Sequence, residues 1–397
     1  MRIPLVAAAL AVASPAFAQP AIAPALAARL DPVIDRALSE KRIVGAVVLV
    51  AKDGKMVYRR AAGYADREAG TKMREDAIFR LASVTKPFVT AAAMRLVEDG
   101  RLDLDAPVTR WLPDFRPALP DGSIPAITIR HLLTHTSGLG YAFLEPAGGP
   151  YHRLNVSDGL DQPGLSLDEN LARLSAAPLA FAPGAGWRYS LGIDVVGGVL
   201  EAIEGRSLSD IVRDEVTAPL GIDDTGFSVR DASRLAKAYA DGDPEPVAMT
   251  DGQAVPLRGL AATFAPSRIL DTKSYRSGGA GMAGTASDVL RFLEAIRTGG
   301  SPILKPETVG RMIQDQVGTA AESQGPGWGF GYGWAVLVDP TRTGTPQAAG
   351  TLQWGGAYGH SWFIDRENGL VVVALTNTAF EGMAGAFPTD VRNAVYE

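Results

Sequence analysis

Ser83 and Lys86 have the residue types and the spacing of a nucleophile and its base. Both lie in the segment Leu81–Phe88, which opens the longest clean helical pattern in the chain. Residues three apart on a helix lie on the same face, so the amine of Lys86 can reach the hydroxyl of Ser83. The positive end of the helix dipole also favours the negative charge that develops on the serine oxygen. Acyl transfer through a covalent serine intermediate needs a base within hydrogen-bond reach of the serine, and this arrangement is one way to supply it.

The pair makes two demands on its surroundings. Lys86 must be a neutral amine to accept a proton, and burial or a neighbouring cation favours that form. Pro87 falls in the first turn of the expected helix, where its missing N–H removes no helical hydrogen bond. The spacing Ser-x-x-Lys occurs once in the chain, but so short a motif also arises by chance and needs support from other segments.

Several further motifs accompany this pair in a fixed order. They are Phe79–Lys86, His131–Leu139 (HLLTHTSGL), Pro183-Gly184 leading to Tyr189-Ser190-Leu191, Trp354-Gly355-Gly356, and Tyr358–Asp365. Together they resemble the serine β-lactamase and penicillin-binding protein superfamily, and most closely its class C-like branch that includes the family VIII carboxylesterases. The resemblance covers nearly all of the chain that follows residue 18.

The resemblance implies roles for three more groups. Tyr189 matches the family's tyrosine, whose phenol shares proton transfer with the lysine; a packed core tyrosine is the alternative. Whether Lys86 or Tyr189 takes the first proton stays open. The backbone N–H groups of Ser83 and Ala357 match the donors of the oxyanion hole. No metal and no organic cofactor is implied.

Two departures from the lactamase pattern concern substrate recognition. Leu191 stands where lactamases have an asparagine that hydrogen-bonds the amide side chain of a β-lactam. Trp354 replaces the lysine that would attract a substrate carboxylate, as it does in family VIII esterases. Both changes favour a neutral ester, and short-chain carboxylic esters are the expected substrates. Gly355 and Gly356 would let that substrate approach the backbone closely.

Three further side chains are candidate substrate contacts. Tyr358 is expected as an outer wall of the pocket, with simple packing as the alternative. His360 sits on an expected strand close to Trp354, where it could line the site, have a structural role or assist catalysis. Tyr141 lies in a loop-like region and is a candidate for the acyl or alcohol pocket, as are Trp328 and Phe330. Packing in the core is the alternative for all three.

Other chemistries fit the sequence less well. The G-x-S-x-G elbow of α/β-hydrolases is absent. His131 and His135 have a spacing that could bind a metal, but the glutamate of H-E-x-x-H is missing. Two alternatives within the superfamily remain: a β-lactamase or D-amino-acid peptidase, and a penicillin-binding module that stays acylated.

The composition is that of a folded chain. Of 397 residues, 46% are hydrophobic and 21% charged, and the formal net charge is −6. These values lie outside the range of disordered chains, and the acidic balance gives no electrostatic reason to bind nucleic acid. We therefore expect no nucleic acid as partner. The resemblance implies a small-molecule ester as partner, and we take a monomer as the default state.

Residues 1–18 have the pattern of a signal peptide. Arg2 gives a positive start, Leu5–Val12 is apolar, and Ala16-Phe17-Ala18 forms an A-x-A cleavage site. A buried N-terminal helix is the alternative interpretation. We expect a periplasmic or secreted mature protein with no membrane anchor after cleavage. The chain has no Cys, which excludes disulfides and thiolate metal sites.

The order of expected elements indicates an α+β fold. A helix over about 26–42 precedes a hairpin, 44–50 and 56–58, that turns at Asp53-Gly54. Strand patterns recur at 331–338, 360–364 and 370–375, and a closing helix starts at about Met383. Helical patterns fill the middle, at about 84–99, 128–135, 168–176, 191–204, 207–214, 286–297 and 306–313, with Gly- and Pro-rich loops at 144–164 and 240–266.

These elements assemble most simply into one antiparallel sheet built from both chain ends, with helices against it. The expected domains are a sheet domain, 19–78 and 315–397, and an inserted, mainly helical domain, 79–314. The active site would lie between the two.

Overall fold

The computed structural model describes residues 23–397. The expected signal peptide, residues 1–18, lies outside this range and stays a prediction. Within residues 23–397, no helix is both long enough and apolar enough to cross a membrane.

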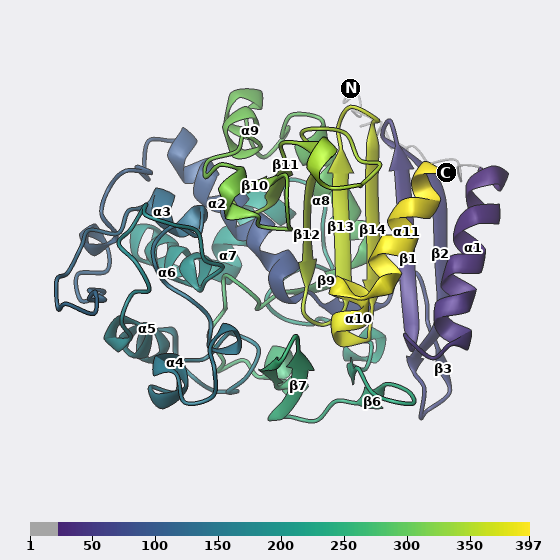
Figure 1. Cartoon of the computed structure of the whole chain (residues 1–397), viewed down its shortest axis with the longest axis horizontal. Helices are drawn as coiled ribbons and strands as arrows, with labels where there is room; N and C mark the ends of the chain where they lie inside the picture. The colour runs from purple at the N-terminus through teal and green to yellow at the C-terminus, as the bar shows by residue number, and fades with distance from the viewer. Residues whose placement is uncertain (1–22) are drawn as a thin grey trace, which may run out of the picture.

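The chain alternates helices with short strands, and its longer strands lie near the two ends (Figure 1). The helices are α1 (Pro24–Ser39), α2 (Thr85–Glu98), α3 (Ile129–Leu133), α4 (Pro150–Arg153), α5 (Leu167–Ala176), α6 (Gly192–Glu204), α7 (Leu208–Val212), α8 (Ala286–Arg297), α9 (Pro306–Met312), α10 (Ala379–Ala384) and α11 (Ala386–Tyr396). The strands are β1 (Gly45–Lys52), β2 (Lys55–Asp66), β3 (Thr71–Lys72), β4 (Ile78–Arg80), β5 (Tyr239–Ala240), β6 (Val247–Ala248), β7 (Gln253–Leu257), β8 (Leu260–Phe264), β9 (Ala283–Thr285), β10 (Trp328–Phe330), β11 (Ala335–Leu337), β12 (Leu352–Gly356), β13 (His360–Asp365) and β14 (Leu370–Thr376).

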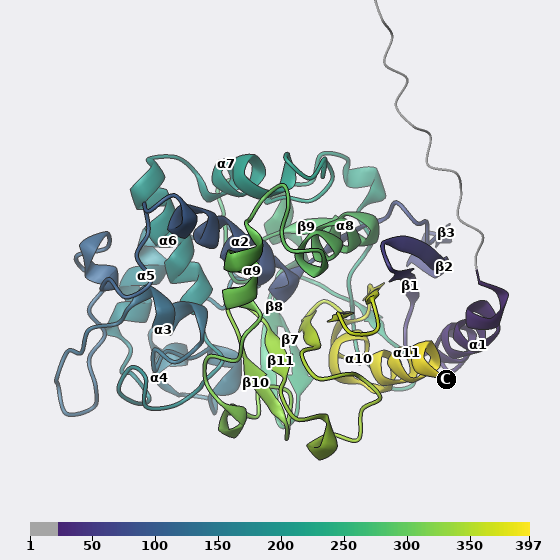
Figure 2. The ribbon, with the colours of Figure 1, turned by 90° about the horizontal axis from the view of Figure 1, so that it is seen from above.

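One antiparallel sheet joins the two ends of the chain. Its strand order is β10-β11-β12-β13-β14-β1-β2-β3, so the first long strand pairs with the last one. Alternate side chains of β1 face opposite sides, because successive residues of a strand point to opposite faces. Val48 and Val50 pack with α1 and α11, whereas Val47 and Leu49 pack with α2 and α8. Figure 2 shows these two helical layers on opposite sides of the strands. The expected α+β class is confirmed.

The expected hairpins form as predicted. Lys52 pairs with Lys55 across a two-residue turn in which Asp53 and Gly54 have φ of 51° and 76°. Positive φ at both positions matches the right-handed twist of the flanking strands. The second hairpin joins β13 to β14, with Asp365 opposite Leu370.

Two expectations for local structure were wrong. Residues 331–338 were expected as one strand, but the chain turns at Gly333 (φ 87°), and β11 is short. The expected loop 240–266 contains the β7–β8 hairpin, with Arg258-Gly259 at its turn. The sequence does not predict this hairpin, because Pro256 is unfavourable in a strand and the apolar stretches on both sides of the turn are short. Its buried face packs through tertiary contacts with Tyr358 and Phe380, which local patterns do not reveal.

The expected helices of the middle region are present within about three residues at each end. α2 is buried on nearly all sides, as an apolar helix at the centre of a large domain should be. α8 packs against β1 and β14 of the sheet, although it belongs to the range 79–314. The division into two domains stays a prediction.

We predict that Gly63→Ala lowers the free energy of unfolding by more than Gly70→Ala does. Both glycines have positive φ, 78° and 71°, so both substitutions cost about 1 kcal/mol from backbone strain. A Cβ at Gly63 would also lie 2.3 Å from the Val44 carbonyl oxygen, whereas nothing lies within 4 Å at Gly70. Urea unfolding of the two variants measures the difference, and equal losses would contradict the close approach of β1 and β2 at Gly63.

Candidate active site

Ser83 lies at the junction between a strand and a helix. After β4 the chain makes a 3₁₀ turn, Ala82–Val84, and enters α2 directly. Ala82 has φ 45°, a left-handed conformation that costs free energy in a residue with a Cβ. The turn is held on the β9 side, where Leu81 N donates to Met282 O (2.8 Å) and Met282 N donates to Thr85 Oγ1 (3.1 Å). These contacts fix the direction of the Ser83 side chain.

Lys86 and Tyr189 both contact the Ser83 hydroxyl. The Lys86 Nζ lies 3.2 Å from Ser83 Oγ, and the Tyr189 hydroxyl lies 2.7 Å from it. Lys86 is fully buried, donates to Gly279 O (2.8 Å), and has its Nζ 4.7 Å from the centre of the Tyr189 ring. The structure therefore brings the three residues of the predicted catalytic group together around one oxygen.

Tyr189 is held by aromatic and polar neighbours just before α6. The His135 ring packs edge-on against it, with centroids 4.9 Å apart, and His135 Nδ1 lies 3.1 Å from Ser190 Oγ. Burial, together with the charge of Lys86, holds the pKa of His135 well below its usual value, so this ring is neutral. Trp354 Nε1 donates to the Tyr189 hydroxyl at 3.4 Å. His131 and His135 thus belong to the scaffold around the site.

The end of β12 lies directly beside the Ser83 turn. A Cβ at Gly356 would lie 2.4 Å from Leu81 O, so only glycine permits this approach. Ala357 follows Gly356, and it lines the same cleft as Ser83. Within residues 23–397, the backbone N–H groups of Ser83 and Ala357 donate to no protein acceptor. Both are therefore free to bind a substrate oxygen, and their role as oxyanion donors stays a prediction.

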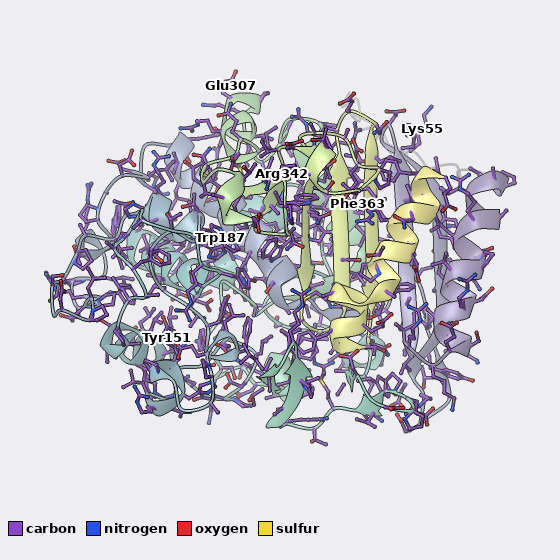
Figure 3. All side chains as sticks on the ribbon, in the orientation of Figure 1. Lys55, Tyr151, Trp187, Glu307, Arg342 and Phe363 are labelled. Atoms are coloured by element: carbon purple, nitrogen blue, oxygen red, sulfur yellow. The ribbon has the colours of Figure 1, made fainter. Side chains whose placement is uncertain are left out.

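A cleft of about 1030 Å³ opens from Ser83. Its walls come from the helical region, from the β7–β8 hairpin and from the sheet; Trp187 and Phe363 mark two of these sides in Figure 3. Near Ser83 the walls are mostly aromatic or aliphatic. They include Tyr141, Phe143, Trp187, Tyr189, Leu257, Leu260 and Trp354.

The predicted substrate contacts divide into two groups. Tyr141, Trp354 and Gly355 line the cleft as expected. Leu191 and His360 do not, and we revise their roles: both are fully buried. Leu191 precedes α6 and its side chain is part of the core.

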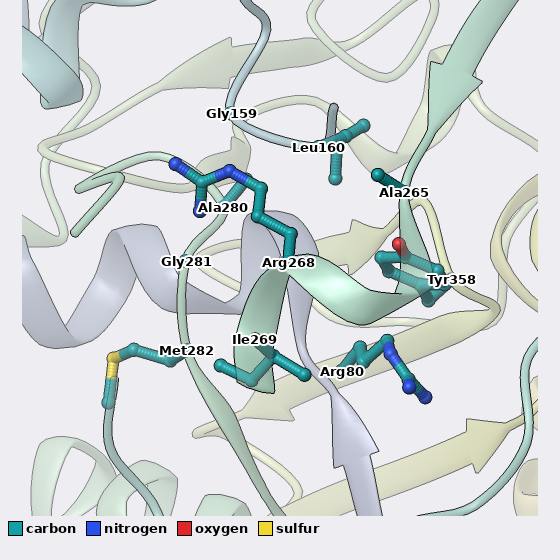
Figure 4. Close-up of a pocket in the computed structure, with 10 residues that line it drawn as sticks. All are labelled: Arg80, Gly159, Leu160, Ala265, Arg268, Ile269, Ala280, Gly281, Met282 and Tyr358. Atoms are coloured by element: carbon teal, nitrogen blue, oxygen red, sulfur yellow. The ribbon is translucent and has the colours of Figure 1, made fainter. Parts of the chain in front are cut away.

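Besides Leu191, three predicted contact residues do not line the cleft. They are His360, Tyr358 and Gly356. The carbonyl of Arg80 accepts a hydrogen bond from His360 Nε2 (2.7 Å), which ties β13 to the end of β4. Tyr358 lines a separate cavity of about 20 Å³ together with Arg80 and Arg268 (Figure 4). His360 lies opposite Gly356 across β12 and β13, and its ring packs edge-on against Phe79 with centroids 5.7 Å apart.

The sequence did not predict several residues of the cleft wall. Phe143 lies 4.7 Å from Tyr141, centroid to centroid, in a stacked pair. Trp187 also lines the cleft and packs on Phe330. Phe330, which was expected in the pocket together with Trp328, packs on Trp354, and neither Phe330 nor Trp328 lines the cleft. Phe330, expected in a loop, belongs to β10. Trp187 could have been predicted as a wall residue from the sequence, because it is an aromatic residue only two positions before Tyr189.

Asp158 fixes the wall segment that carries Tyr141. Its carboxyl oxygens accept hydrogen bonds from the N–H groups of Ala142 (2.7 Å) and Phe143 (3.0 Å). Burial, with a smaller effect of Asp161, raises the pKa of Asp158 to about 8. Both oxygens of this carboxyl group are therefore used in hydrogen bonds to the backbone of the cleft wall.

Metal chemistry finds no support in the described residues. Between residues 23 and 397, no three His, Cys, Asp or Glu side chains are arranged to hold a metal ion.

The antiparallel sheet, the helix that begins after Ser83 and the Ser-Lys-Tyr group define a serine hydrolase of the β-lactamase fold. The chain belongs to the β-lactamase family, because the model described as Beta-lactamase matches residues 30–395. This confirms the resemblance seen in the sequence.

Relatives within the family include enzymes named as esterases. The chain is 60% identical to Esterase EstB of Burkholderia gladioli over 94% of this chain and 96% of that protein. Among solved structures, it is similar to "EstCE1, a hydrolase with promiscuous acyltransferase activity", with a TM-score of 0.92 and 51% identity over 94% of this chain and 99% of that one. Simvastatin synthase of Aspergillus terreus shares the fold, with a TM-score of 0.74 and 24% identity over 92% and 93% of the two chains.

We predict that His360→Gln makes the unfolding free energy less dependent on pH between 6.5 and 4. Burial lowers the pKa of His360 from 6.5 to about 4, so below pH 6.5 the unfolded chain binds a proton that the folded chain does not. The wild type should lose about 3 kcal/mol through this residue as pH falls across that window. Gln keeps an N–H donor for Arg80 O and does not titrate.

The measurement is urea unfolding at several pH values. His152→Gln is the matched control, because it makes the same substitution at an exposed histidine. If His360→Gln follows the wild-type curve, His360 is not a buried neutral imidazole.

Proposed function

We propose that this protein is a serine carboxylesterase that hydrolyses short-chain carboxylic esters through an acyl-enzyme on Ser83. One observation carries the proposal: Ser83 Oγ lies between Lys86 Nζ and the Tyr189 hydroxyl, in a cleft whose walls near the serine are mostly apolar. The relatives named as an esterase and as a hydrolase with acyltransferase activity, at 60% and 51% identity over nearly the whole chain, support the same chemistry.

The reaction starts when Ser83 Oγ attacks the ester carbonyl. Its proton passes to the Lys86–Tyr189 pair, and the carbonyl oxygen becomes an oxyanion bound by the N–H groups of Ser83 and Ala357. The tetrahedral intermediate collapses, the pair returns the proton to the leaving alcohol, and the acyl group stays on Ser83. Water then attacks the acyl-enzyme by the same route and releases the acid.

The walls of the cleft favour a neutral substrate. Trp354 supplies an apolar surface beside Tyr189, with ring centroids 5.1 Å apart, in place of a cation that would bind a carboxylate. Leu191 lies in the core and presents no amide group to the cleft. A β-lactam would find neither of its expected polar partners, whereas an uncharged ester needs only the oxyanion donors and an apolar wall.

Export of the mature protein belongs to the proposal. The pattern of residues 1–18 supports a periplasmic or secreted location after cleavage. Detection of the mature N-terminus at Gln19 in a periplasmic or extracellular fraction would test the location. We also take a monomer as the default state, which sedimentation would test.

We predict that the purified mature protein hydrolyses p-nitrophenyl butyrate and that Ser83→Ala lowers kcat by more than about 1000-fold. The variant removes only the nucleophile, so its unfolding free energy should stay near that of the wild type. Initial rates with titrated enzyme measure the effect. A folded Ser83→Ala protein that retains most of its activity would exclude Ser83 as the nucleophile.

A chromogenic cephalosporin measured in parallel separates the esterase from the alternatives. Faster turnover of the cephalosporin than of the butyrate ester would indicate a β-lactamase. Stable acylation without turnover of either compound would indicate a penicillin-binding module.

We predict that Tyr189→Phe lowers kcat by about 100-fold with little change in KM, since a shared proton-transfer group contributes about that much. The ring stays, so its packing on His135 and Trp354 is kept. Tyr332→Phe is the control: Tyr332 is a buried tyrosine whose hydroxyl contacts Arg130, and its loss should leave kcat unchanged. Equal kcat values for Tyr189→Phe and the wild type would remove this phenol from the mechanism.

A further inference from the structure

Asp194 is a buried acid to which the reaction steps above assign no role. It lies in the first turn of α6, five residues after Tyr189, and only 2% of its surface is exposed. Within residues 23–397 neither carboxyl oxygen has a hydrogen-bond partner. Burial of such a group costs free energy, and groups of this kind cluster at functional sites.

The Asp194 carboxyl group lies next to the catalytic lysine, separated from it by a bare glycine. A Cβ at Gly279 would lie 2.4 Å from Asp194 Oδ2, 3.0 Å from the Tyr141 hydroxyl and 3.3 Å from Lys86 Nζ. Three polar atoms from three segments thus converge on one backbone position. The Gly279 carbonyl itself accepts a hydrogen bond from Lys86 Nζ at 2.8 Å.

The loop 277–281, Ser-Gly-Gly-Ala-Gly, is built to leave this space open. A Cβ at Gly278 would lie 2.4 Å from the Ile193 carbonyl oxygen, so the loop packs directly on the first turn of α6. Any side chain at Gly279 would push Asp194 and Lys86 apart. The small residues keep the carboxyl group and the amine close to each other.

The charge of Lys86 needs a partner that its direct contacts do not supply. Its described contacts are Ser83 Oγ, Gly279 O and the rings of Tyr141 and Tyr189, and it forms no ion pair within 4.0 Å in the part of the chain that the structure describes. Asp194 is a carboxyl group that interacts with it: burial raises the pKa of Asp194, and the charge of Lys86 counteracts part of that rise.

Other groups also act on this pair, and none replaces Asp194. Arg268 opposes the rise in the pKa of Asp194, as Lys86 does, while Tyr141, Tyr275 and Asp158 interact with Asp194 as acids. The Ser277 hydroxyl and the Gly279 N–H also lower the pKa of Asp194, although neither makes a hydrogen bond of normal geometry to the carboxyl group. His135 is neutral and adds no charge.

We propose that the Asp194 carboxylate is a positioning residue that stabilises the ammonium form of Lys86 during acyl transfer. The proton leaves Ser83 Oγ, resides on the Lys86–Tyr189 pair and ends on the leaving alcohol, while Asp194 keeps its charge throughout. The carboxylate acts from behind Gly279 and does not touch the substrate. This inference rests on the proposed esterase function.

The test is the pH profile of kcat for p-nitrophenyl butyrate with Asp194→Asn. Loss of the negative charge makes the Lys86 ammonium less favourable, so the acidic limb of the profile should move to lower pH by about one unit. kcat at the wild-type optimum should fall about 10- to 100-fold with little change in KM, because the carboxylate acts on the proton-transfer pair. Active sites are titrated by the burst of p-nitrophenol, so a partly misfolded sample does not alter kcat.

Asp288→Asn is the matched control. Asp288 is also an acid whose pKa is raised by burial, but it contacts Asp224 and Thr225 instead of Lys86. Its loss should leave the pH limb in place. Asp194→Ser provides a second variant if the asparagine protein is insoluble.

An unchanged acidic limb in active Asp194→Asn or Asp194→Ser would overturn the proposal, even if stability falls. The same limb shift in Asp288→Asn would overturn it as well, because the effect would then be general. Failure of the wild type to turn over the ester counts against the proposed function instead, so the two failures are distinguishable.

Discussion

The hydrogen bond from His360 to the carbonyl of Arg80 joins two segments that are 280 residues apart, and the geometry of the site depends on this junction. Arg80 ends the strand that leads into the nucleophile turn, and His360 begins a central strand of the sheet. Gly356 packs against the same turn through its bare Cα. Only with both contacts in place do the N–H groups of Ser83 and Ala357 border one cleft.

The second constraint is electrostatic, since an amine that must exchange a proton is fully buried. Its immediate surroundings are aromatic faces, a backbone carbonyl and the serine oxygen. Low local polarity strengthens every charge interaction there. The neutral ring of His135 and the glycine-rich loop 277–281 serve the same end, because they fill the space around Lys86 without adding a competing charge.

Local sequence patterns were enough to predict the sheet made from both chain ends, the hairpin at Asp53-Gly54 and the long helices. The motif around Ser83 and the resemblance predicted which side chains would meet. Contacts set by tertiary packing were not predictable in this way. The β7–β8 hairpin depends on Phe380 and Tyr358, and His360 faces the core only because of its strand register. Asp194 carries no motif, and its proximity to Gly279 appears only in three dimensions.

The pairing of β1 with β14 has a consequence for biosynthesis. β1 is made early, but its neighbour β14 ends at Thr376, so the central sheet stays incomplete until almost the entire chain has been synthesised. Pairings of such long sequence separation form slowly, because a large loop must close before the contacts are gained. The nascent chain therefore remains without its native core for most of translation. Until β14 is available, the strand edges of β1 and β13 stay unpaired, and such edges favour aggregation.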